Sequence, residues 1–448
     1  MRKIGDWLFA KEFLGQSRRA PEALVVRQAL RAGGGRKIMS KGKIVREKKE
    51  EEGSNKLELA DILREYLPGY LSKYGVTFHQ WKVLKAIEKC RTKEMGYHLR
   101  ECEKCGHQEW RYNSCKNRHC PKCQWGEQYE WVKKRMEELP GAKYHHTVFT
   151  VPDGELYALM IMNKEVMYEM IIKAAAETLK AFGEDPKHLG AKIGMIGVLH
   201  TWGQTLNYHV HVHFLVPAGG LTKDGERWKR SKYGDKFLFP IRAMSKVFRG
   251  KFIAKLKKAY KEEELVLEGK LEEIATPAEF GKYLNRLARH TFRVHSKPAT
   301  KDAKQVVKYL GGYMRRVAIS NSRLEEMGGG KVVFKYKDNR DKGKEKRCRM
   351  EGEEFIRRFV EHIIPEGFVR VRYYGIFAGS RRKQNLAKAR KLIGGLEEKE
   401  AGDREQDKEP RCPVCGEGKM VVVEYIRQPV SIVWLLVLTM TMKYEDTS

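Results

Sequence analysis

Three histidines alternate with two valines near the middle of the chain, and this pattern restricts the backbone more than any other stretch. His209, His211 and His213 are separated by Val210 and Val212. Alternate residues of a β-strand point to the same face, so a strand would place all three imidazoles on one side and both valines on the other. We therefore predict a strand here, anchored in a core by its valines.

The imidazoles of this run have two interpretations. They are ordinary polar residues of a half-exposed strand, or they are ligands of a metal ion, because imidazole is both a common surface group and the commonest metal ligand. A strand would hold a His-x-His pair rigidly enough for the second role. A hydrolase motif of the His-x-His-x-Asp-His kind is excluded, since Val212 stands where the aspartate would be.

A pair of tyrosines is the second candidate for chemistry. Tyr309 and Tyr313 lie four residues apart in the segment 301–317, whose apolar spacing predicts a helix. Side chains at this spacing share a helix face about 5 to 6 Å apart, although such pairs are normally packing features. Two glycines between the tyrosines would let a sugar-phosphate backbone approach, and basic residues suited to phosphate surround the pair. These residues are Lys308, Arg315 and Arg316.

Five of the nine cysteines are clustered between Cys102 and Cys123. Cys102 and Cys105 form one Cys-x-x-Cys pair, and after fourteen residues Cys120 and Cys123 form another. This spacing is close to that of a structural zinc knuckle. We therefore predict a structural zinc ion bound by these two pairs.

Other residues near the cysteine pairs could replace or extend this ligand set. Cys115 and His119 are surplus candidates within the second half of the cluster. Cys412 and Cys415 resemble half of a second knuckle far downstream. Zinc would fold a small domain, and nearby basic residues would direct it towards DNA phosphates. These basic residues are Arg111, Lys116, Arg118 and Lys122.

The charge of the chain indicates a polyanionic partner. Its 448 residues include 89 Lys and Arg against 58 Asp and Glu, a formal net charge of +31, and nucleic acid is the first candidate. The longest apolar run, Val430–Met442, is 13 residues long and too short to cross a bilayer. No Gly-x-x-x-x-Gly-Lys-Ser/Thr loop occurs, so we expect no nucleotide cofactor. The absence of an export signal predicts a cytoplasmic protein with reduced thiols.

Strand and helix patterns alternate loosely along the chain and predict an α+β fold with a largely antiparallel sheet. The strands are expected at 144–151, 192–199, 208–216, 292–295, 331–337 and 368–374. The helices are expected at 127–139, 155–182, 241–259, 277–287, 301–317 and 353–363, with two short ones within 57–90 that are interrupted by Pro68 and Gly69.

Four strings of residues resemble a known family. They are Leu-His-Thr-Trp-Gly-Gln at 199–204, His-Val-His-Val-His at 209–213, Tyr-Leu-Gly-Gly-Tyr followed by Arg-Arg-Val-Ala-Ile-Ser-Asn within 309–321, and Tyr-Asn-Ser-Cys-Lys-Asn-Arg-His-Cys-Pro-Lys-Cys-Gln at 112–124. The first three resemble the two-tyrosine HUH transposases of rolling-circle insertion sequences, in the family numbered ninety-one. The last resembles the zinc-binding domain of that family. The likeness runs from about residue 57 to about residue 395.

Composition and the resemblance together predict a domain organisation. We expect a basic flexible extension over 1–54, a zinc-binding domain over 55–135, a catalytic domain over 140–376, and a charged linker and tail with a Cys-x-x-Cys pair over 377–448. The catalytic domain would have the antiparallel sheet of an HUH endonuclease with flanking helices.

The resemblance also implies ligands for a catalytic Mg or Mn ion. His211 and His213 would bind it, with a third ligand from Gln204, His200 or His209. The ion would polarise a phosphate and neutralise charge in the transition state.

Tyr309 and Tyr313 would be alternating nucleophiles that cut the single-stranded ends of a mobile element, leaving a 5′-phosphotyrosine and a 3′-hydroxyl. Rejoining would then need no ATP, because the linkage keeps the phosphodiester energy. A replication initiator or relaxase would use the same chemistry, but the zinc cluster favours a transposase. A non-catalytic zinc-dependent DNA-binding regulator would leave the histidine run unexplained.

Overall fold

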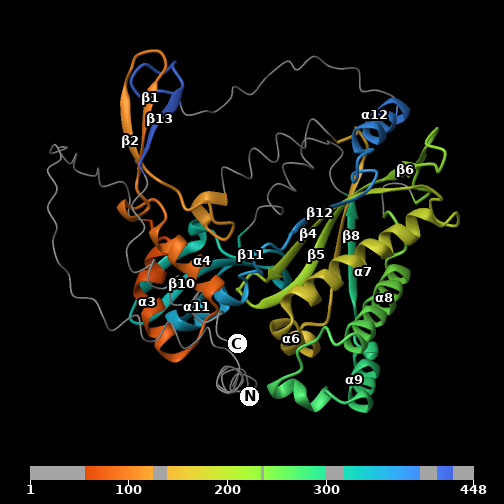
Figure 1. The fold of residues 1–448 in the computed structure, drawn as a ribbon. Coiled ribbons are helices and arrows are strands. Elements are labelled where there is room, and N and C mark those ends of the chain that lie inside the picture. The colour runs from red at the N-terminus through yellow and green to blue at the C-terminus, as the bar shows by residue number, and fades with distance from the viewer. Residues whose placement is uncertain (1–55, 125–138, 234–236, 299–316, 394–410, 427–448) are drawn as a thin grey trace, which may run out of the picture.

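The computed structural model describes residues 56–124, 139–233, 237–298, 317–393 and 411–426 of the 448-residue chain (Figure 1). The expected extension over 1–54, the helices expected at 127–139 and 301–317 and the apolar run Val430–Met442 lie outside these ranges, wholly or nearly so. No helix in the described part of the chain is long and apolar enough to cross a membrane.

A five-stranded antiparallel sheet lies at the centre of the molecule, in the order β12-β4-β5-β3-β8. In that order the strands are Val371–Gly375, Gly194–Trp202, Tyr208–Pro217, Tyr144–Thr150 and Arg293–Pro298. The strand β5 contains the histidine run and is the middle strand of the sheet, paired with β4 and β3. The strand expected over 208–216 is thus confirmed.

Helices cover one face of this sheet. They are α6 (Asp153–Met162), α7 (Lys164–Glu184) and α8 (Ile241–Lys261), and α9 (Pro277–Arg289) packs against α8. Figure 1 shows α7 and α8 running side by side along the sheet. Val210, Val212 and Phe214 of β5 are buried in the core beneath these helices. Burial of the valine face fixes the histidines on the opposite face.

The single helix expected over 155–182 is divided in two at Asn163. The side-chain amide of Asn163 donates to the carbonyl oxygens of Leu159 and Val266, and its oxygen accepts from the backbone N–H of Val266. An asparagine that bonds backbone groups in this way competes with helical hydrogen bonds. It therefore ends α6 and begins α7.

The other face of the sheet is packed against α12 (Arg382–Ile393). Ile196 of β4 and Leu215 of β5 share a small core with Leu386 of α12. Leu215 lies two residues beyond His213, so α12 covers the part of this face that adjoins the histidines.

A second core joins the N-terminal helices to a later part of the chain. It contains residues of α3 (Leu59–Lys73), α4 (Phe78–Lys89), β9 (Leu324–Gly328), β10 (Lys331–Asp338), β11 (Lys344–Glu351) and α11 (Gly352–Glu361). Leu63, Phe334 and Phe355 are buried in it. The short helix η1 (Lys93–Met95) follows α4 and buries no residue. The start of α11 lies so close to α3 that a side chain at Gly352 would overlap the ring of Tyr66.

The break between the two N-terminal helices is not where Pro68 and Gly69 predict it. Pro68 lies inside α3, which continues to Lys73. The break falls before Thr77, whose side chain accepts from the backbone N–H of Gln80 while the Gln80 side chain accepts from the N–H of Thr77. This reciprocal cap begins α4, and tertiary burial of α3 outweighs the helix-breaking tendency of proline.

A third, small sheet was not predicted. Its strands are β1 (Tyr97–Cys102), β2 (Gln108–Tyr112) and β13 (Met420–Ile426), in the order β13-β1-β2, and Figure 1 shows it projecting from the rest of the molecule. The remaining short elements are β6 (Gly219–Leu221), β7 (Trp228–Arg230), η2 (Gly269–Ile274), η3 (Asn321–Arg323) and η4 (Asn339–Asp341). The fold is therefore the expected α+β class with antiparallel sheets.

Candidate metal and DNA-processing site

Three histidines from two neighbouring strands converge on the face of the sheet opposite α7 and α8. His200 of β4 pairs directly with His211 of β5, and His213 lies two residues further along β5. Directly paired and alternate residues share one face of a sheet. The ligand atoms of His200, His211 and His213 all lie within 4.8 Å of one another.

The outer nitrogens of two of these rings have defined partners. His211 donates from Nδ1 to the carbonyl oxygen of His209 at 2.8 Å. Nδ1 of His213 lies 2.7 Å from Nε2 of His146, a residue of β3. Contacts of this kind fix the orientation and tautomer of a metal-binding imidazole. They make Nε2 the atom that His211 and His213 would offer to an ion.

Burial favours the neutral imidazole at His211 and at the neighbouring His146. Desolvation, helped by the neighbouring His209, lowers the pKa of His211 to about 3. Desolvation likewise lowers the pKa of His146 to about 4, with a smaller contribution from His295. Neutral imidazole is the form that binds metal ions. The three-histidine cluster therefore fits a divalent cation that keeps further positions for oxygen atoms of water or phosphate.

Of the three candidates for the third ligand, the structure brings only His200 to His211 and His213. Nδ1 of His209 lies 2.5 Å from a carboxylate oxygen of Asp153, at the start of α6. The side chain of Gln204 accepts from the backbone N–H of Lys337 at 3.4 Å, on β10. Both expected alternatives are thus directed to other elements. The pairing of β4 with β5, which no local spacing reveals, selects His200.

Basic side chains on the edge strand β8 lie on the same face as the histidines. His295 pairs with Val148 of β3, which in turn pairs with His213. Arg293 and Lys297 flank His295 at alternate positions and are exposed, as it is. They form a row of cations that continues from the histidines to the sheet edge. These residues were not predicted from the sequence, although their alternation along 293–297 was a usable signal.

The predicted nucleophiles lie outside the described residues, in the segment 299–316. They are Tyr309 and Tyr313, with the neighbouring Lys308, Arg315 and Arg316. The described chain before this segment ends at Pro298, which pairs with His145 on β3. The last described residue before the segment therefore lies on β8, the strand that pairs with the His146-bearing strand β3.

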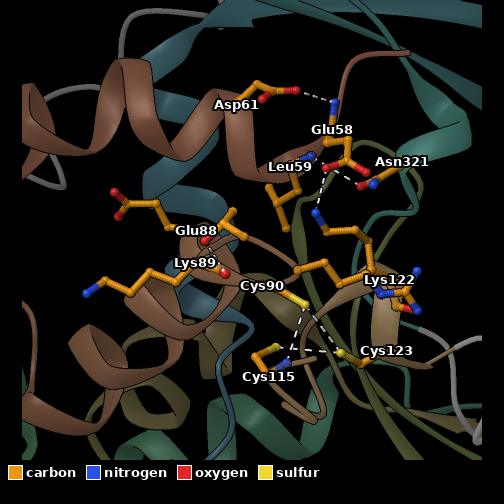
Figure 2. Close-up of polar contacts among 12 residues, drawn as sticks. Glu58, Leu59, Asp61, Glu88, Lys89, Cys90, Cys115, Lys122, Cys123 and Asn321 are labelled. Carbon is orange, nitrogen blue, oxygen red and sulfur yellow. Dashed lines mark hydrogen bonds and ion pairs between the residues drawn. The ribbon is translucent and has the colours of Figure 1, made fainter. Parts of the chain in front are cut away.

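Four cysteines form a cluster beside the N-terminal helices: Cys90, Cys115, Cys120 and Cys123. The sulfur of Cys123 lies 3.5 Å from that of Cys90 and 3.6 Å from that of Cys115. Figure 2 shows the side chains of these three cysteines directed towards one another. Tetrahedral zinc with bonds of about 2.3 Å places its sulfurs about 3.8 Å apart, so the spacing fits.

The cluster around Cys90, called the first cysteine cluster below, lies where segments distant in sequence contact one another. Lys122, next to Cys123, forms an ion pair of 2.7 Å with Glu58, and the backbone N–H of Leu59 donates to the side chain of Asn321 (Figure 2). Cys90 is the C-cap residue of α4. It was not among the predicted ligands, because it lies outside any Cys-x-x-Cys pair.

The remaining predicted ligands do not join this cluster. Cys102 and Cys105 lie in a separate group with Cys412 and Cys415. The single site expected from the pairs at 102–105 and 120–123 is therefore replaced by two clusters of four cysteines. His119 belongs to neither, and burial lowers its pKa well below the usual value. The sequence spacing identified each pair correctly but could not show which pairs meet.

Comparisons with known proteins agree with this arrangement. A family described as "Putative transposase" matches residues 194–385, which include all three clustered histidines. A second family, described as a transposase zinc-binding domain, matches residues 62–151, which include the first cysteine cluster. No solved structure matches the chain significantly.

Two similar proteins span most of the chain. A protein of Sinorhizobium fredii (strain NBRC 101917 / NGR234) with the same transposase description is 40% identical over 380 residues, which is 82% of this chain and 95% of that protein. The transposase for insertion sequence element IS801 of Pseudomonas savastanoi pv. phaseolicola is 28% identical over 302 residues, 67% of this chain and 70% of its own length. With its histidine cluster and cysteine-rich module, the chain belongs to the IS91 family of two-tyrosine transposases that carry a transposase zinc-binding domain.

Proposed function

We propose that this transposase nicks and rejoins single-stranded DNA through a covalent 5′-phosphotyrosine. The observation that carries the proposal is the convergence of His200, His211 and His213 on one sheet face. Three imidazoles whose ligand atoms converge on one point form the kind of ligand set that a catalytic ion requires. The central sheet then has the role of an HUH endonuclease sheet, and residues 140–376 form the catalytic domain.

The histidine cluster would bind the ion that contacts the scissile phosphate, and β8 would contact the neighbouring DNA backbone. When bound, a Mg²⁺ or Mn²⁺ ion would polarise the phosphate and neutralise the charge that develops on it. His146 keeps His213 oriented through the 2.7 Å contact between their ring nitrogens. Arg293 and Lys297 attract and align the DNA backbone along the same sheet face.

The covalent step uses one of the two tyrosines at a time. The oxygen of Tyr309 or Tyr313 bonds to phosphorus, the bond from phosphorus to the 3′ oxygen breaks, and the tyrosine proton passes to that oxygen. The position of Pro298 on β8 supports this assignment, because Tyr309 follows Pro298 by only 11 residues, a reach of up to about 38 Å. Attack by a second 3′-hydroxyl on the phosphotyrosine reverses the step and joins new ends without ATP.

The first cysteine cluster has a structural role in this proposal. Zinc bound by Cys90, Cys115, Cys120 and Cys123 would fix the end of α4 to the segment that carries Arg118 and Lys122. Arg118 already reaches across to donate to the carbonyl oxygen of Phe368 at 2.7 Å. A zinc-binding domain over 55–135 would thus be braced against the segment that leads into β12.

A labelled single-stranded oligonucleotide carrying an element end tests the covalent step. With Mn²⁺ we expect a slower-migrating adduct that survives denaturation and disappears when Tyr309 and Tyr313 are both changed to Phe. Tyr336→Phe on β10 is the matched control and should form the adduct at the wild-type level. Absence of an adduct in the wild type, or its persistence in the double variant, would refute the proposed mechanism.

The histidine assignment has its own control within the same strand. His211→Ala should abolish adduct formation, because it removes a half-buried ligand of the cluster. His209→Ala removes an imidazole of the same run that pairs with Asp153 instead, and should leave most of the activity. Equal loss of adduct formation in both variants would contradict the assignment of His211, and not His209, as a metal ligand.

A further inference from the structure

Two Cys-x-x-Cys-Gly turns from opposite parts of the sequence face each other in the small sheet. The sulfur of Cys102 lies 3.7 Å from that of Cys415, and the sulfur of Cys105 lies 3.6 Å from that of Cys412. The partners are separated by 313 and 307 residues of chain. All four sulfurs lie within 4.8 Å of one another.

The two turns have the same backbone geometry. Gly106 follows the first pair with φ of +72°, and Gly416 follows the second with φ of +70°. The N–H of Gly106 donates to the carbonyl oxygen of Cys102 at 3.0 Å, and that of Gly416 to Cys412 at 2.9 Å. Only glycine adopts such positive φ angles without cost, so both turns have the residue they require.

Backbone N–H groups point at the sulfurs in both turns. Cys102 accepts from the N–H of Cys105 at 3.5 Å, and Cys412 accepts from the N–H of Val414 at 3.4 Å. The N–H of Gly418 reaches Cys415 at 3.3 Å. Hydrogen bonds of this kind stabilise thiolate sulfur, which is the form that binds metal.

The later turn is followed by a strand that completes the small sheet. β13 pairs with β1 from Cys102↔Met420 to Tyr97↔Ile426. The side chain of Asn113, just after β2, donates to the carbonyl oxygen of Ile426 at 3.1 Å. Thus the segment 411–426 is hydrogen-bonded to residues 97–113, called the N-terminal module below, which begin more than 300 residues earlier in the chain.

Apolar burial does not account for this association. Val421–Ile426 are all exposed, so β13 contributes almost no core. A small sheet without a core needs a covalent or metal crosslink to be stable. Two disulfides are a possible alternative chemistry, but sulfur atoms in a disulfide are about 2.05 Å apart and these are much further. The separations instead approach the value of about 3.8 Å that tetrahedral zinc imposes.

We propose that Cys102, Cys105, Cys412 and Cys415 bind one Zn²⁺ ion that fastens the segment 411–426 to the N-terminal module. Cys412 and Cys415 lie outside both segments that the transposase families match, 62–151 and 194–385. The site is therefore additional to the cluster around Cys90, and it does not depend on the proposed DNA chemistry. Its zinc would close the small sheet from two separate parts of the chain.

Zinc stoichiometry of the full chain tests the site. We expect two zinc ions per chain in the wild type and one in the double variant Cys412→Ser/Cys415→Ser. Cys348→Ser is the matched control, because this cysteine of β11 lies in neither cluster, and it should keep both ions. A double variant that retains two ions, or a wild type that binds one, would overturn the proposal, as would finding that the four thiols are oxidised to disulfides.

If the double variant misfolds and loses both zinc ions, its stoichiometry does not test the site. A second measurement then tests whether zinc holds the C-terminal segment. A specific protease site is placed within 394–410 and an affinity tag after residue 448 in an otherwise unchanged chain. After cleavage, the tagged C-terminal fragment should remain bound to the rest of the protein in zinc. The fragment carrying Cys412→Ser/Cys415→Ser should separate under the same conditions. Separation of the unchanged fragment, or retention of the variant one, would contradict a zinc fastening.

Discussion

The row of cations on β8 provides a quantitative test of where DNA crosses the protein. Arg293→Gln and Lys297→Gln together remove two positive charges from the sheet face that carries the histidines, while leaving His295 and the strand pairing in place. Both side chains are exposed, so the substitutions leave no cavity. The expected effect is a loss of electrostatic affinity and not of stability.

The size of the effect follows from counterion release. Each phosphate neutralised on single-stranded DNA contributes about −0.7 to the slope of log affinity against log salt, so the double variant should have a slope smaller by about 1.4. Over a fourfold rise in salt, the wild type should therefore lose about sevenfold more affinity than the variant.

Fluorescence anisotropy with a labelled single-stranded oligonucleotide, repeated at several salt concentrations, measures both slopes. Lys257→Gln/Lys261→Gln is the matched control. These exposed lysines belong to α8, which packs on the opposite face of the sheet, and their removal changes the net charge equally. An unchanged slope in the β8 variant, or an equal decrease in the control, would refute a DNA path along β8.

Three further outcomes follow from the structure. His146→Phe should weaken Mn²⁺ binding by about 10- to 100-fold in calorimetry, since it removes the contact that orients His213; unchanged affinity would contradict this role. Gly352→Ala should lower the free energy of unfolding by about 1 to 3 kcal/mol in urea, because the new methyl group overlaps Tyr66. Burial lowers the pKa of Lys164 to about 8, so the unfolded state binds more protons above that pH. Stability relative to a Lys164→Met variant should therefore rise between about pH 8 and 10.5, and a flat difference would refute the burial argument.

Much of the central sheet could be predicted from local pattern. The alternation of histidine with valine required a strand with two unlike faces, and β5 has them: Val210 and Val212 are buried under the helices, while His211 and His213 face the other way. Burial of one face fixes the orientation of a strand, because a shift of one residue would turn every side chain over. The pattern therefore determined part of the site as well as the strand.

The third histidine was decided by strand pairing. His200, His209 and Gln204 are all close to the run in sequence, and nothing local distinguishes them. In the folded chain, His200 lies directly opposite His211 on the adjacent strand, whereas His209 pairs with Asp153. Register between strands depends on the whole sheet, so it is a property of the tertiary structure.

The cysteines show most clearly what the sequence determined and what the tertiary structure decided. By itself the sequence determined that Cys102 with Cys105, and Cys412 with Cys415, form turns able to hold a metal, because two residues between cysteines and a following glycine set the local backbone. Which turn faces which was decided only by the tertiary structure, which brings these two together and gives Cys120 and Cys123 to Cys90 and Cys115. The physical reason is that the entropy of closing a loop rises slowly with its length, so a partner 313 residues away competes well with one fifteen residues away.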